Sequence, residues 1–314
     1  MTEEQTPITG SISLREIQQE EARQKAEILI ESLDWLKRFR DQIIVIKFGG
    51  NAMVDAELLQ HFADDMVYLR YAGILPVVVH GGGPQITQAL QERQIVSEFR
   101  AGYRYTSTEA IQVVTEVLTT KVRAELTDAI DEHGKLAAGT SGAESDIFLA
   151  EPLVVEEDGR PVELGHVGKV TKVNTKGIIE ILHSGQIPVV SSIARDAFGE
   201  LLNINADAAA AELAIALSAA KLIILTDVAG LYRDWPNTDS LISQIDTTAL
   251  AELLPSLESG MIPKMQACFD AVVGGVDKAA ILDGRQPHAV LLEIFTTAGI
   301  GTEVIPAEPE GNES

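Results

Sequence analysis

The sequence "VVVHGGGPQI" at residues 77–86 joins a run of valines to His80, to three consecutive glycines and then to Pro84. Valine runs are typical of strands buried on both faces of a sheet, and proline is tolerated in the first turn of a helix. Glycine at the carboxyl end of a strand lets the backbone approach a ligand closely, and the following helix presents free N–H groups to an anion. The stretch therefore predicts an α/β fold with an anion-binding loop at one sheet edge. The alternative is a tight turn without a ligand.

The rest of the chain alternates between strand and helix patterns. Runs rich in Ile and Val predict buried strands at 43–47, 74–79, 186–191 and 221–228. Amphipathic segments predict helices at roughly 54–72, 84–94, 108–133, 175–184, 206–219 and 262–275. An Asp-Gly pair within residues 153–164 predicts a β-hairpin. Short strands linked by helices indicate a largely parallel sheet covered on both faces, with ligands outside the carboxyl ends of its strands.

The composition argues against several classes of protein. A chain of 314 residues suits one large α/β unit or two lobes. Its formal charge of −23 makes nucleic acid an unlikely partner, because a polyphosphate backbone requires clustered Lys and Arg. No apolar run approaches the roughly 20 residues of a spanning helix and the first residues are acidic, so we expect a cytoplasmic protein with no membrane partner. Cys268, the single cysteine, excludes an internal disulfide, and we expect it to be a buried, inert thiol.

A helix with one apolar stripe is predicted over residues 13–40, before the first strand. The stripe follows a four-three spacing and consists of Ala22, Ala26, Leu29, Leu33 and Leu36. Two readings stay open, because the stripe is buried either against its own domain or against another subunit.

A second glycine loop, "IKFGGNAM" at residues 46–53, places Lys47 at the end of a strand and two glycines after it. Two such loops on one sheet edge, one of them with a lysine, favour a ligand site over two plain turns. Common signatures are missing: the chain has no P-loop, no dinucleotide fingerprint and no G-x-S-x-G nucleophile elbow. The histidines have no zinc-ligand spacing.

Three further segments carry polar residues at the ends of predicted elements. Asn203, Asn205 and Asp207 alternate in "NINADAAAAELA", and an aspartate there is often only a helix cap. "LTDVAGLY" ends a strand at residues 225–232, and "SGMIPKMQA" opens a helix around Lys264.

Together, eight motifs in order resemble those of the acetylglutamate kinases, which belong to the amino acid kinase family. They are IKFGGNAM, VVVHGGGPQI, AGYRYTS, LGHVGKVTKVNT, LLNINADAAAAELA, LIILTDVAGLY, SGMIPKM and EIFTTAGIGTEV, and the likeness covers roughly residues 43–305. It implies a three-layer α/β/α sandwich. It also implies a lobe for the amino-acid substrate at 41–195 and a lobe for ATP at 196–306, preceded by an acidic tail and oligomerisation helix at 1–40 and followed by a flexible tail at 307–314.

The implied reaction moves the γ-phosphoryl group of MgATP to the side-chain carboxylate of N-acetyl-L-glutamate, the second step of arginine biosynthesis. A carboxylate with a pKa of about 4.3 is already ionised at neutral pH, so it requires cations rather than a general base. By resemblance, Lys47 and Lys264 stabilise the transition state and Asp207 holds both lysines. The resemblance assigns the substrate to Gly81, Gly82, Arg104, Asn203 and Asn205. It assigns the nucleotide and its phosphates to Gly49, Gly50, Thr226, Asp227, Gly230 and Leu231. Mg²⁺ is expected to arrive with ATP, without a strong cage of protein ligands.

The N-terminal helix resembles that of arginine-sensitive acetylglutamate kinases, in which such a helix links dimers into a hexamer, a trimer of dimers. The resemblance implies feedback inhibition by arginine near Trp35, His288, Glu293 and Gly299. Lys169 and Ala143 depart from the family pattern and bring the substrate preference into question. The rival interpretations are a sibling kinase acting on another acceptor, such as aspartate, glutamate, an aminoadipate derivative, carbamate or UMP, and a catalytically silent sensor of arginine or nucleotide.

Overall fold

The computed structural model describes residues 14–157, 159–296 and 299–308, and the chain divides after Arg38 into two compact units. The smaller unit contains α1 (Leu14–Glu31) and most of α2 (Leu33–Phe39). The helix expected over residues 13–40 is therefore two helices, interrupted at Ser32. The Ser32 hydroxyl donates to the carbonyl of Leu29 at 2.8 Å, and serine side chains that bond to a preceding turn bend helices.

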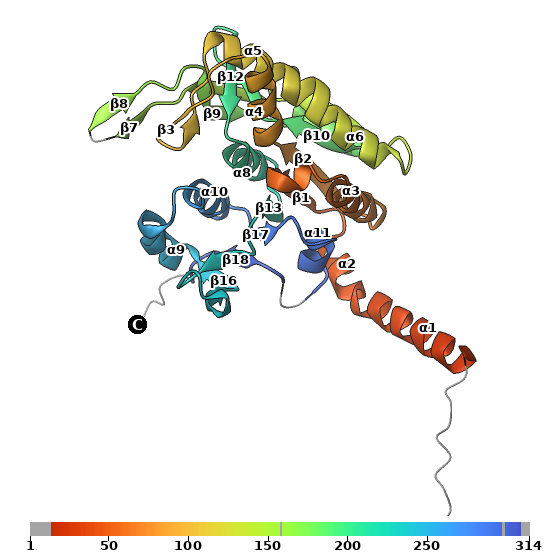
Figure 1. The fold of residues 1–314 in the computed structure, drawn as a ribbon. Helices are drawn as coiled ribbons and strands as arrows, with labels where there is room; N and C mark the ends of the chain where they lie inside the picture. Colours follow the sequence, from red (N-terminus) through yellow and green to blue (C-terminus); the bar gives the residue numbers. More distant parts are fainter. Residues whose placement is uncertain (1–13, 158, 297–298, 309–314) are drawn as a thin grey trace, which may run out of the picture. The chain divides into compact units, whose positions relative to one another are not determined.

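The larger unit is built on one eight-stranded sheet (Figure 1). Its strands, in spatial order, are β16 (Gln244–Asp246), β18 (Thr302–Ile305), β17 (Lys278–Asp283), β13 (Lys221–Thr226), β1 (Ile43–Phe48), β2 (Leu75–His80), β10 (Ile187–Ser191) and β5 (Ala137–Ser141). The six strands from β17 to β5 are parallel, and β18 runs antiparallel to β17. The expected largely parallel sheet is confirmed, and its antiparallel edge is an addition that sequence analysis did not anticipate.

Helices cover both faces of this sheet, which confirms the three-layer arrangement. They are α3 (Ala56–Tyr71), α4 (Gly83–Glu92), α5 (Thr108–Glu116), α6 (Arg123–Asp131), α7 (Lys176–His183), α8 (Ala206–Ala216), α9 (Thr247–Leu253), α10 (Ile262–Val273) and α11 (Ala289–Ile294). Short 3₁₀ turns span Gly50–Met53, Thr238–Ser240 and Leu254–Ser256. The six amphipathic segments are confirmed as helical. One of them, at 108–133, contains a π-helical segment, η2 (Val117–Val122), between α5 and α6.

Alternation along β1 decides which side chains meet which helices. Val45 belongs to a buried cluster with the alanines of α8 and with Cys268 of α10. Phe48 points to the other face, where its ring stacks on Phe62 of α3 at 4.0 Å between centroids. Because successive side chains of a strand point to opposite faces, Lys47 shares the α8 face with Val45.

Strand β10 of the sheet leads into a small closed barrel. It consists of β11 (Ile193–Arg195), β12 (Leu201–Ile204), β9 (Val167–Val173) and β6 (Phe148–Pro152). Three hairpins complete the fold: β3 (Phe99–Arg100) with β4 (Tyr103–Arg104), β7 (Val155–Glu157) with β8 (Arg160–Val162), and β14 (Leu231–Tyr232) with β15 (Leu241–Ile242). The hairpin expected within residues 153–164 is thus confirmed. The chain passes from β10 into the barrel and leaves it through β12 into α8, which brings barrel and sheet edge together.

The division of the larger unit into lobes at 41–195 and 196–306 stays a prediction. The sheet holds strands of both segments side by side, with β1, β2, β10 and β5 from the first and the other four from the second. Of the tails, residues 1–13 and 309–314 lie outside the described residues. No helix in the described part of the chain combines the length and apolar character that crossing a membrane requires.

Candidate active site

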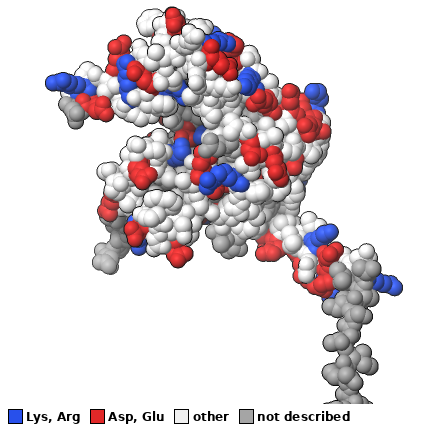
Figure 2. All heavy atoms as spheres, in the orientation of Figure 1, with Lys and Arg blue, Asp and Glu red and all other residues white. Residues whose placement is uncertain are grey.

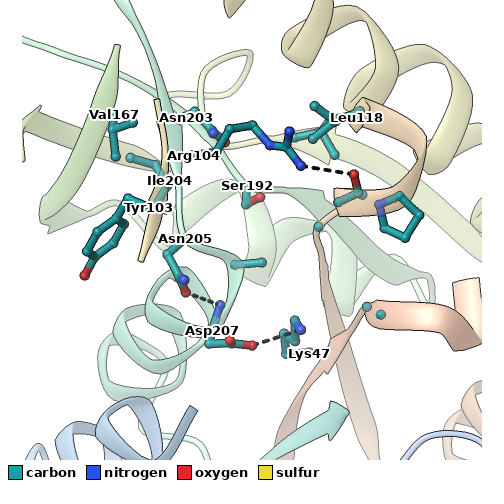
Figure 3. Close-up of a pocket in the computed structure, with 18 of the residues that line it drawn as sticks. Lys47, Tyr103, Arg104, Leu118, Val167, Ser192, Asn203, Ile204, Asn205 and Asp207 are labelled. Atoms are coloured by element: carbon teal, nitrogen blue, oxygen red, sulfur yellow. Dashed lines mark hydrogen bonds and ion pairs between the residues drawn. The ribbon is translucent and has the colours of Figure 1, made fainter. Parts of the chain in front are cut away.

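A cavity of about 330 Å³ lies at the carboxyl ends of β1, β2 and β10, beneath the barrel (Figure 3). Glycine loops, polar side chains and apolar side chains line it: Lys47, Gly49, Gly50, Gly81, Gly82, Gly83, Pro84, Ile86, Phe99, Gly102, Tyr103, Arg104, Leu118, Val167, Ser192, Asn203, Ile204, Asn205, Ala206, Asp207 and Lys264. The cavity brings together all the residues expected to be catalytic or to bind the amino-acid substrate. Its place at the strand ends is where open α/β sheets bind ligands.

Two lysines from different elements converge on one carboxylate. Lys47 of β1 lies with Nζ 2.9 Å from Oδ1 of Asp207, and Lys264 of α10 donates to Oδ2 at 3.1 Å. Lys47 and Asp207 are buried, while the Lys264 side chain keeps 23% of its surface exposed. Oδ1 receives no well-aligned hydrogen bond within the described structure, so its contact with Lys47 is mainly one between charges.

The electrostatics favour an ionised Asp207. Burial acts to raise the pKa of this carboxyl, but the ammonium groups of Lys47 and Lys264 outweigh burial and hold the pKa below its ordinary value. The site therefore contains two ammonium groups and one carboxylate, with a net positive charge. In Figure 2, basic atoms gather in the hollow of the larger unit, whereas acidic atoms spread over its outer surface.

Asn205, not Asp207, caps α8. The Asn205 side-chain oxygen accepts hydrogen bonds from the N–H groups of Asp207 and Ala208 at 2.9 and 3.0 Å. Asp207 is thereby free to face the lysines, so the alternative in which it serves only as a cap does not hold. Asn203 lies two residues earlier, on β12, where its Nδ2 donates to Thr106 Oγ1 at 3.4 Å.

In the first glycine loop, Gly49 lies beside the ammonium group of Lys47 and Gly50 lies beside the carboxylate of Asp227. A Cβ atom at Gly49 would lie 2.7 Å from Nζ of Lys47, so a larger residue there would displace the ammonium group. Gly50 has a positive φ of 78°, and a Cβ there would lie 2.8 Å from Oδ1 of Asp227. Glycine is required at Gly50 because of its backbone conformation, and at Gly49 it leaves the Lys47 ammonium group in place beside Asp207.

The second glycine loop starts α4. A Cβ at Gly82 would lie 2.8 Å from Cδ2 of Leu118, which belongs to the π-helical segment η2. Gly82 offers α4 no side-chain cap, and the first N–H groups of a helix have no acceptor within it. These groups, at the edge of the cavity, are available to an anionic ligand.

Arg104 lies across the cavity from Lys47 and Asp207 (Figure 3). Its guanidinium donates to Thr87 Oγ1 at 2.8 Å, to the carbonyl of Gly83 at 3.3 Å and to Ser97 Oγ. The same group lies 4.8 Å from the centre of the Phe99 ring. Burial lowers the pKa of Arg104, yet an arginine stays charged at neutral pH.

Several lining residues were missed by sequence reasoning. Tyr103, Leu118, Val167 and Ser192 all face the cavity. The only available signal for Tyr103 and Val167 was their place inside the motifs "AGYRYTS" and "LGHVGKV". For Leu118 the sequence contained no signal, because the hydrophobic pattern of a six-residue π-helical segment cannot be told from that of the α-helices on either side.

The residues assigned to the nucleotide lie partly outside this cavity. Thr226 is the last residue of β13 and Asp227 follows it, beside Gly50. Leu231 is buried and its N–H donates to Thr302 Oγ1 at 2.8 Å. Gly230 approaches the same threonine, since a Cβ at Gly230 would lie 2.5 Å from that oxygen.

Three of the residues assigned to arginine lie around α11. The buried Glu293 carboxylate accepts from Lys221 Nζ at 2.6 Å and from the N–H of Ile300 at 3.1 Å. A Cβ at Gly299 would lie 2.7 Å from Oε2 of Glu293, and the Gly299 φ is 62°. His288 precedes α11 and contacts Asp65 Oδ1 through Nδ1 at 2.7 Å. The fourth residue, Trp35, belongs to the smaller unit, where the Arg38 guanidinium lies 6.0 Å from its ring centre.

The remaining residues singled out from the sequence lie outside the cavity. Lys169 is exposed on β9, opposite Glu151 of β6, and Ala143 is buried. Cys268 is buried as expected, and burial together with the charge of Asp207 raises the pKa of its thiol.

Within the described residues, no group of three or more His, Cys, Asp or Glu side chains is arranged to hold a metal ion. Asp207, the acidic residue that lines the cavity, is already paired with two lysines. A divalent cation fits such a site when it arrives on the phosphates of a nucleotide and keeps its own waters, as Mg²⁺ commonly does.

Comparisons with known proteins bear on the family and the fold of this chain. A sequence model of the amino acid kinase family matches residues 42–283. The chain is 60% identical over 284 residues to acetylglutamate kinase from Leifsonia xyli subsp. xyli, covering 90% of this chain and 94% of that one. It is 58% identical over 304 residues to acetylglutamate kinase from Clavibacter michiganensis subsp. michiganensis, covering 96% and 100%. N-acetylglutamate synthase from Neisseria gonorrhoeae, solved with coenzyme A and N-acetyl-glutamate, has the same fold, with a TM-score of 0.80 at 22% identity. The match covers 90% of this chain and 64% of that longer one.

Proposed function

The chain belongs to the amino acid kinase family, and from this membership we propose that it transfers the γ-phosphoryl group of ATP to the side-chain carboxylate of N-acetyl-L-glutamate. The product is N-acetyl-L-glutamyl 5-phosphate, formed in the second step of arginine biosynthesis. The curated relatives at 51–60% identity that carry the name acetylglutamate kinase support this substrate over others of the family.

One observation carries the chemistry: two lysines from different elements meet on Asp207 at one side of a cavity that has Arg104 at the other. This arrangement suits an acceptor with two carboxylates. Arg104 would bind the α-carboxylate, because a guanidinium makes two parallel hydrogen bonds to such a group. The side-chain carboxylate would then extend toward Lys47 and Lys264. Apolar residues such as Val167 and Leu118 offer contacts to the acetyl methyl group.

Phosphoryl transfer requires positioning and charge stabilisation rather than a protein base. Lys47 and Lys264 would neutralise the negative charge that spreads over the phosphoryl oxygens. Asp207 would fix both ammonium groups, and the backbone N–H groups of Gly49 and Gly82 would donate to the same oxygens. Asp227, beside Gly50, is proposed to face the nucleotide. Mg²⁺, when bound to ATP, shields the phosphate charges from the incoming carboxylate.

The direct test is ADP release with MgATP and N-acetyl-L-glutamate, run beside aspartate, glutamate, carbamate and UMP as acceptors. We expect turnover with N-acetyl-L-glutamate alone. Lys47→Ala and Lys264→Ala should each lower kcat by at least about 100-fold, as removal of one preorganised charge-stabilising group does. Lys121→Ala, at an exposed position of η2, is the matched control and should behave like the wild type.

The other outcomes separate the rival interpretations. Turnover with a different acceptor would keep the roles of the lysines and reject the substrate. Silence with every acceptor, together with tight binding of ATP or arginine, would reject an enzyme in favour of a sensor.

We further propose that arginine inhibits this enzyme and that the N-terminal helix joins dimers into a hexamer. The buried Glu293 carboxylate pairs with Lys221 through Oε1, and its Oε2, beside the Gly299 turn, accepts from Ile300 and can accept a second hydrogen bond from a cationic effector. Leu29 of α1 exposes 65% of its surface, and such an apolar stripe on a helix needs a partner surface. We expect light scattering to give a hexamer for the full chain and a dimer after deletion of residues 1–38, with arginine inhibiting only the full chain. Equal masses for the two forms would reject the role of the helix. The cytoplasmic location is proposed on composition, and cell fractionation tests it.

A further inference from the structure

Two buried hydrogen bonds in series link Ser191 of β10 to the second glycine loop. The hydroxyl of Ser191 lies 2.9 Å from Nε2 of His80 and 3.2 Å from the carbonyl of Leu118. On the other side of the ring, Nδ1 of His80 lies 2.9 Å from the carbonyl of Gly81. His80 and Ser191 are both fully buried, and neither lines the cavity.

The acceptors in this series fix the direction of its hydrogen bonds. A carbonyl oxygen can only accept, so Nδ1 of His80 donates to Gly81. Burial lowers the pKa of His80 to about 4, which keeps the ring neutral at pH 7. A neutral imidazole with a proton on Nδ1 accepts at Nε2, and the donor there is the hydroxyl of Ser191. Because that hydroxyl has a single proton, its 3.2 Å contact with the Leu118 carbonyl is not a second hydrogen bond, and the Leu118 carbonyl accepts from the N–H of Arg123 instead.

Sheet register places these groups on the face away from Lys47. Ser191 of β10 pairs with His80 of β2, and His80 pairs with Phe48 of β1. Paired residues of parallel strands point to the same face, which is the face where Phe48 stacks on Phe62 of α3. Lys47 points to the opposite face, toward α8. The hydrogen bond from His80 therefore orients the Gly81 carbonyl toward the α3 face of the sheet, away from the α8 face where the two lysines lie.

The orientation of the Gly81 carbonyl also fixes the direction of the Gly82 N–H, because both belong to one planar peptide group. In a trans peptide, the carbonyl of one residue and the N–H of the next point in opposite directions. A Gly81 carbonyl held toward His80 therefore turns the N–H of Gly82 toward the α8 face, where Ala206 lies beside Gly81. The other face of the Gly82 backbone is blocked by the side chain of Leu118.

We propose that His80 and Ser191 are positioning residues, which hold the Gly81–Gly82 peptide so that the N–H of Gly82 donates to the transferring phosphoryl group. Neither residue touches substrate. The inference rests on the proposed kinase function, because it assigns that N–H a role in the transition state. It also predicts a property of the loop that does not depend on turnover, which is the protection of the loop amides against hydrogen exchange.

The test compares three variants with a matched control. His80→Leu removes the donor to Gly81, His80→Asn keeps a side-chain N–H close to the place of Nδ1, and Ser191→Ala removes the hydroxyl. Thr140→Val is the control, because it deletes a buried hydroxyl of β5 that bonds only to Ser145 among the described residues. Steady-state kinetics with both substrates and amide exchange of a peptide covering residues 79–85 are measured for each protein.

We expect His80→Leu to lower kcat by about 10- to 100-fold, as a misplaced catalytic donor does, with KM changed by less than about 3-fold. His80→Asn should recover at least about 5-fold of that loss, and Ser191→Ala should lower kcat by about 3- to 10-fold. Exchange in the glycine loop should quicken in His80→Leu and Ser191→Ala but not in Thr140→Val.

The proposal is overturned when His80→Leu keeps the kcat of the control, when His80→Asn is no more active than His80→Leu, or when loop exchange is unchanged. If His80→Leu does not fold, the comparison of Ser191→Ala with Thr140→Val decides by the same two readouts. If the wild type shows no turnover with N-acetyl-L-glutamate, the proposed function is rejected instead. The exchange experiment then still tests whether His80 and Ser191 fix the conformation of the glycine loop.

Discussion

Asp207 lies between two ammonium groups, and its surroundings explain why an aspartate suits this position. Its short side chain leaves α8 at the first turn, where Asn205 already satisfies the free N–H groups. The carboxylate can therefore use both oxygens on lysines, one from β1 and one from α10. A buried carboxylate without such partners would become protonated instead.

We predict that Asp207→Asn lowers kcat by at least about 100-fold, because both lysines lose the group that positions them. The variant should also be less stable by about 3 kcal/mol, since the buried Lys47 loses its counter-charge. Kinetics and denaturant unfolding measure the two effects. Glu212→Gln, which removes a half-buried carboxylate elsewhere on α8, is the control and should change activity by less than about 2-fold. Full activity in Asp207→Asn would contradict the assigned role.

His80 gives a prediction about acid stability. In the unfolded chain the imidazole binds a proton below its ordinary pKa of 6.5, whereas in the fold it does so only near pH 4. The unfolded state thus binds more protons between these values, and stability must fall as pH decreases from 6.5 to 4, by about 3 kcal/mol. His80→Asn should lack this part of the pH dependence. Urea unfolding of both proteins at several pH values measures it, and a stability difference that does not vary with pH would contradict the assignment.

The contact between α3 and α11 shows how one element supports another. His288 precedes α11 with a positive φ of 56° and provides no side-chain cap. Asp65 of α3 approaches the helix start instead. Burial raises the pKa of Asp65 to about 6, although His288 and the N–H groups of Leu291 and Val290 act to lower it. The short helix α11 is therefore held at its N-terminus by a residue far away in sequence.

This contact predicts a pH dependence of opposite sign to that of His80. The folded state keeps a proton on Asp65 up to about pH 6, while the unfolded chain releases it near 3.8. Stability must fall as pH rises from 3.8 to 6 and stay reduced above that. We expect Asp65→Asn to be more stable than the wild type at pH 8 by about 1–3 kcal/mol and to lose this advantage at pH 4. Asp64→Asn is the matched control, because the pKa of Asp64 is lowered in the fold, so its loss should destabilise. Denaturant unfolding at both pH values decides.

At the scale of the whole molecule, the excess of acidic residues is the dominant feature. The chain carries 47 acidic and 24 basic residues. Some of the basic residues are buried in ion pairs, such as Lys221 between Glu293 and Glu303, which leaves the outer surface mostly acidic (Figure 2). Like charges on a surface repel one another and oppose the compact state.

We therefore expect the melting temperature to rise with salt, by about 2–6 °C between 20 and 500 mM NaCl, as screening weakens this repulsion. Thermal unfolding followed by circular dichroism measures the change, with KCl at the same ionic strength as the control. A melting temperature that falls with salt would mean that ion pairs such as Lys221–Glu293 dominate over surface repulsion.

The elements themselves could be predicted from the sequence. The strands around Val45, Val78 and Val189, the six helices and the hairpin after residue 153 all follow from periodicities and turn residues that operate over a few positions. The glycine loops could also be placed, because a glycine after a buried strand has few other uses. These features depend on residues only a few positions apart in the chain, so the sequence alone is enough to predict them.

Contacts between distant segments were decided by the tertiary structure. The sequence alone left Asp207 as a possible helix cap, and only the order of β1, α8 and α10 in space turns it toward Lys47 and Lys264. The hydrogen bonds of His80 require Ser191 at the same register of the next strand. The break at Ser32 and the antiparallel β18 likewise depend on hydrogen bonds and strand pairings that no local pattern encodes. Sequence thus determined which groups the protein has and which elements carry them, whereas packing of the sheet and helices decided which groups meet, because the pairing free energy depends on segments that are distant along the chain.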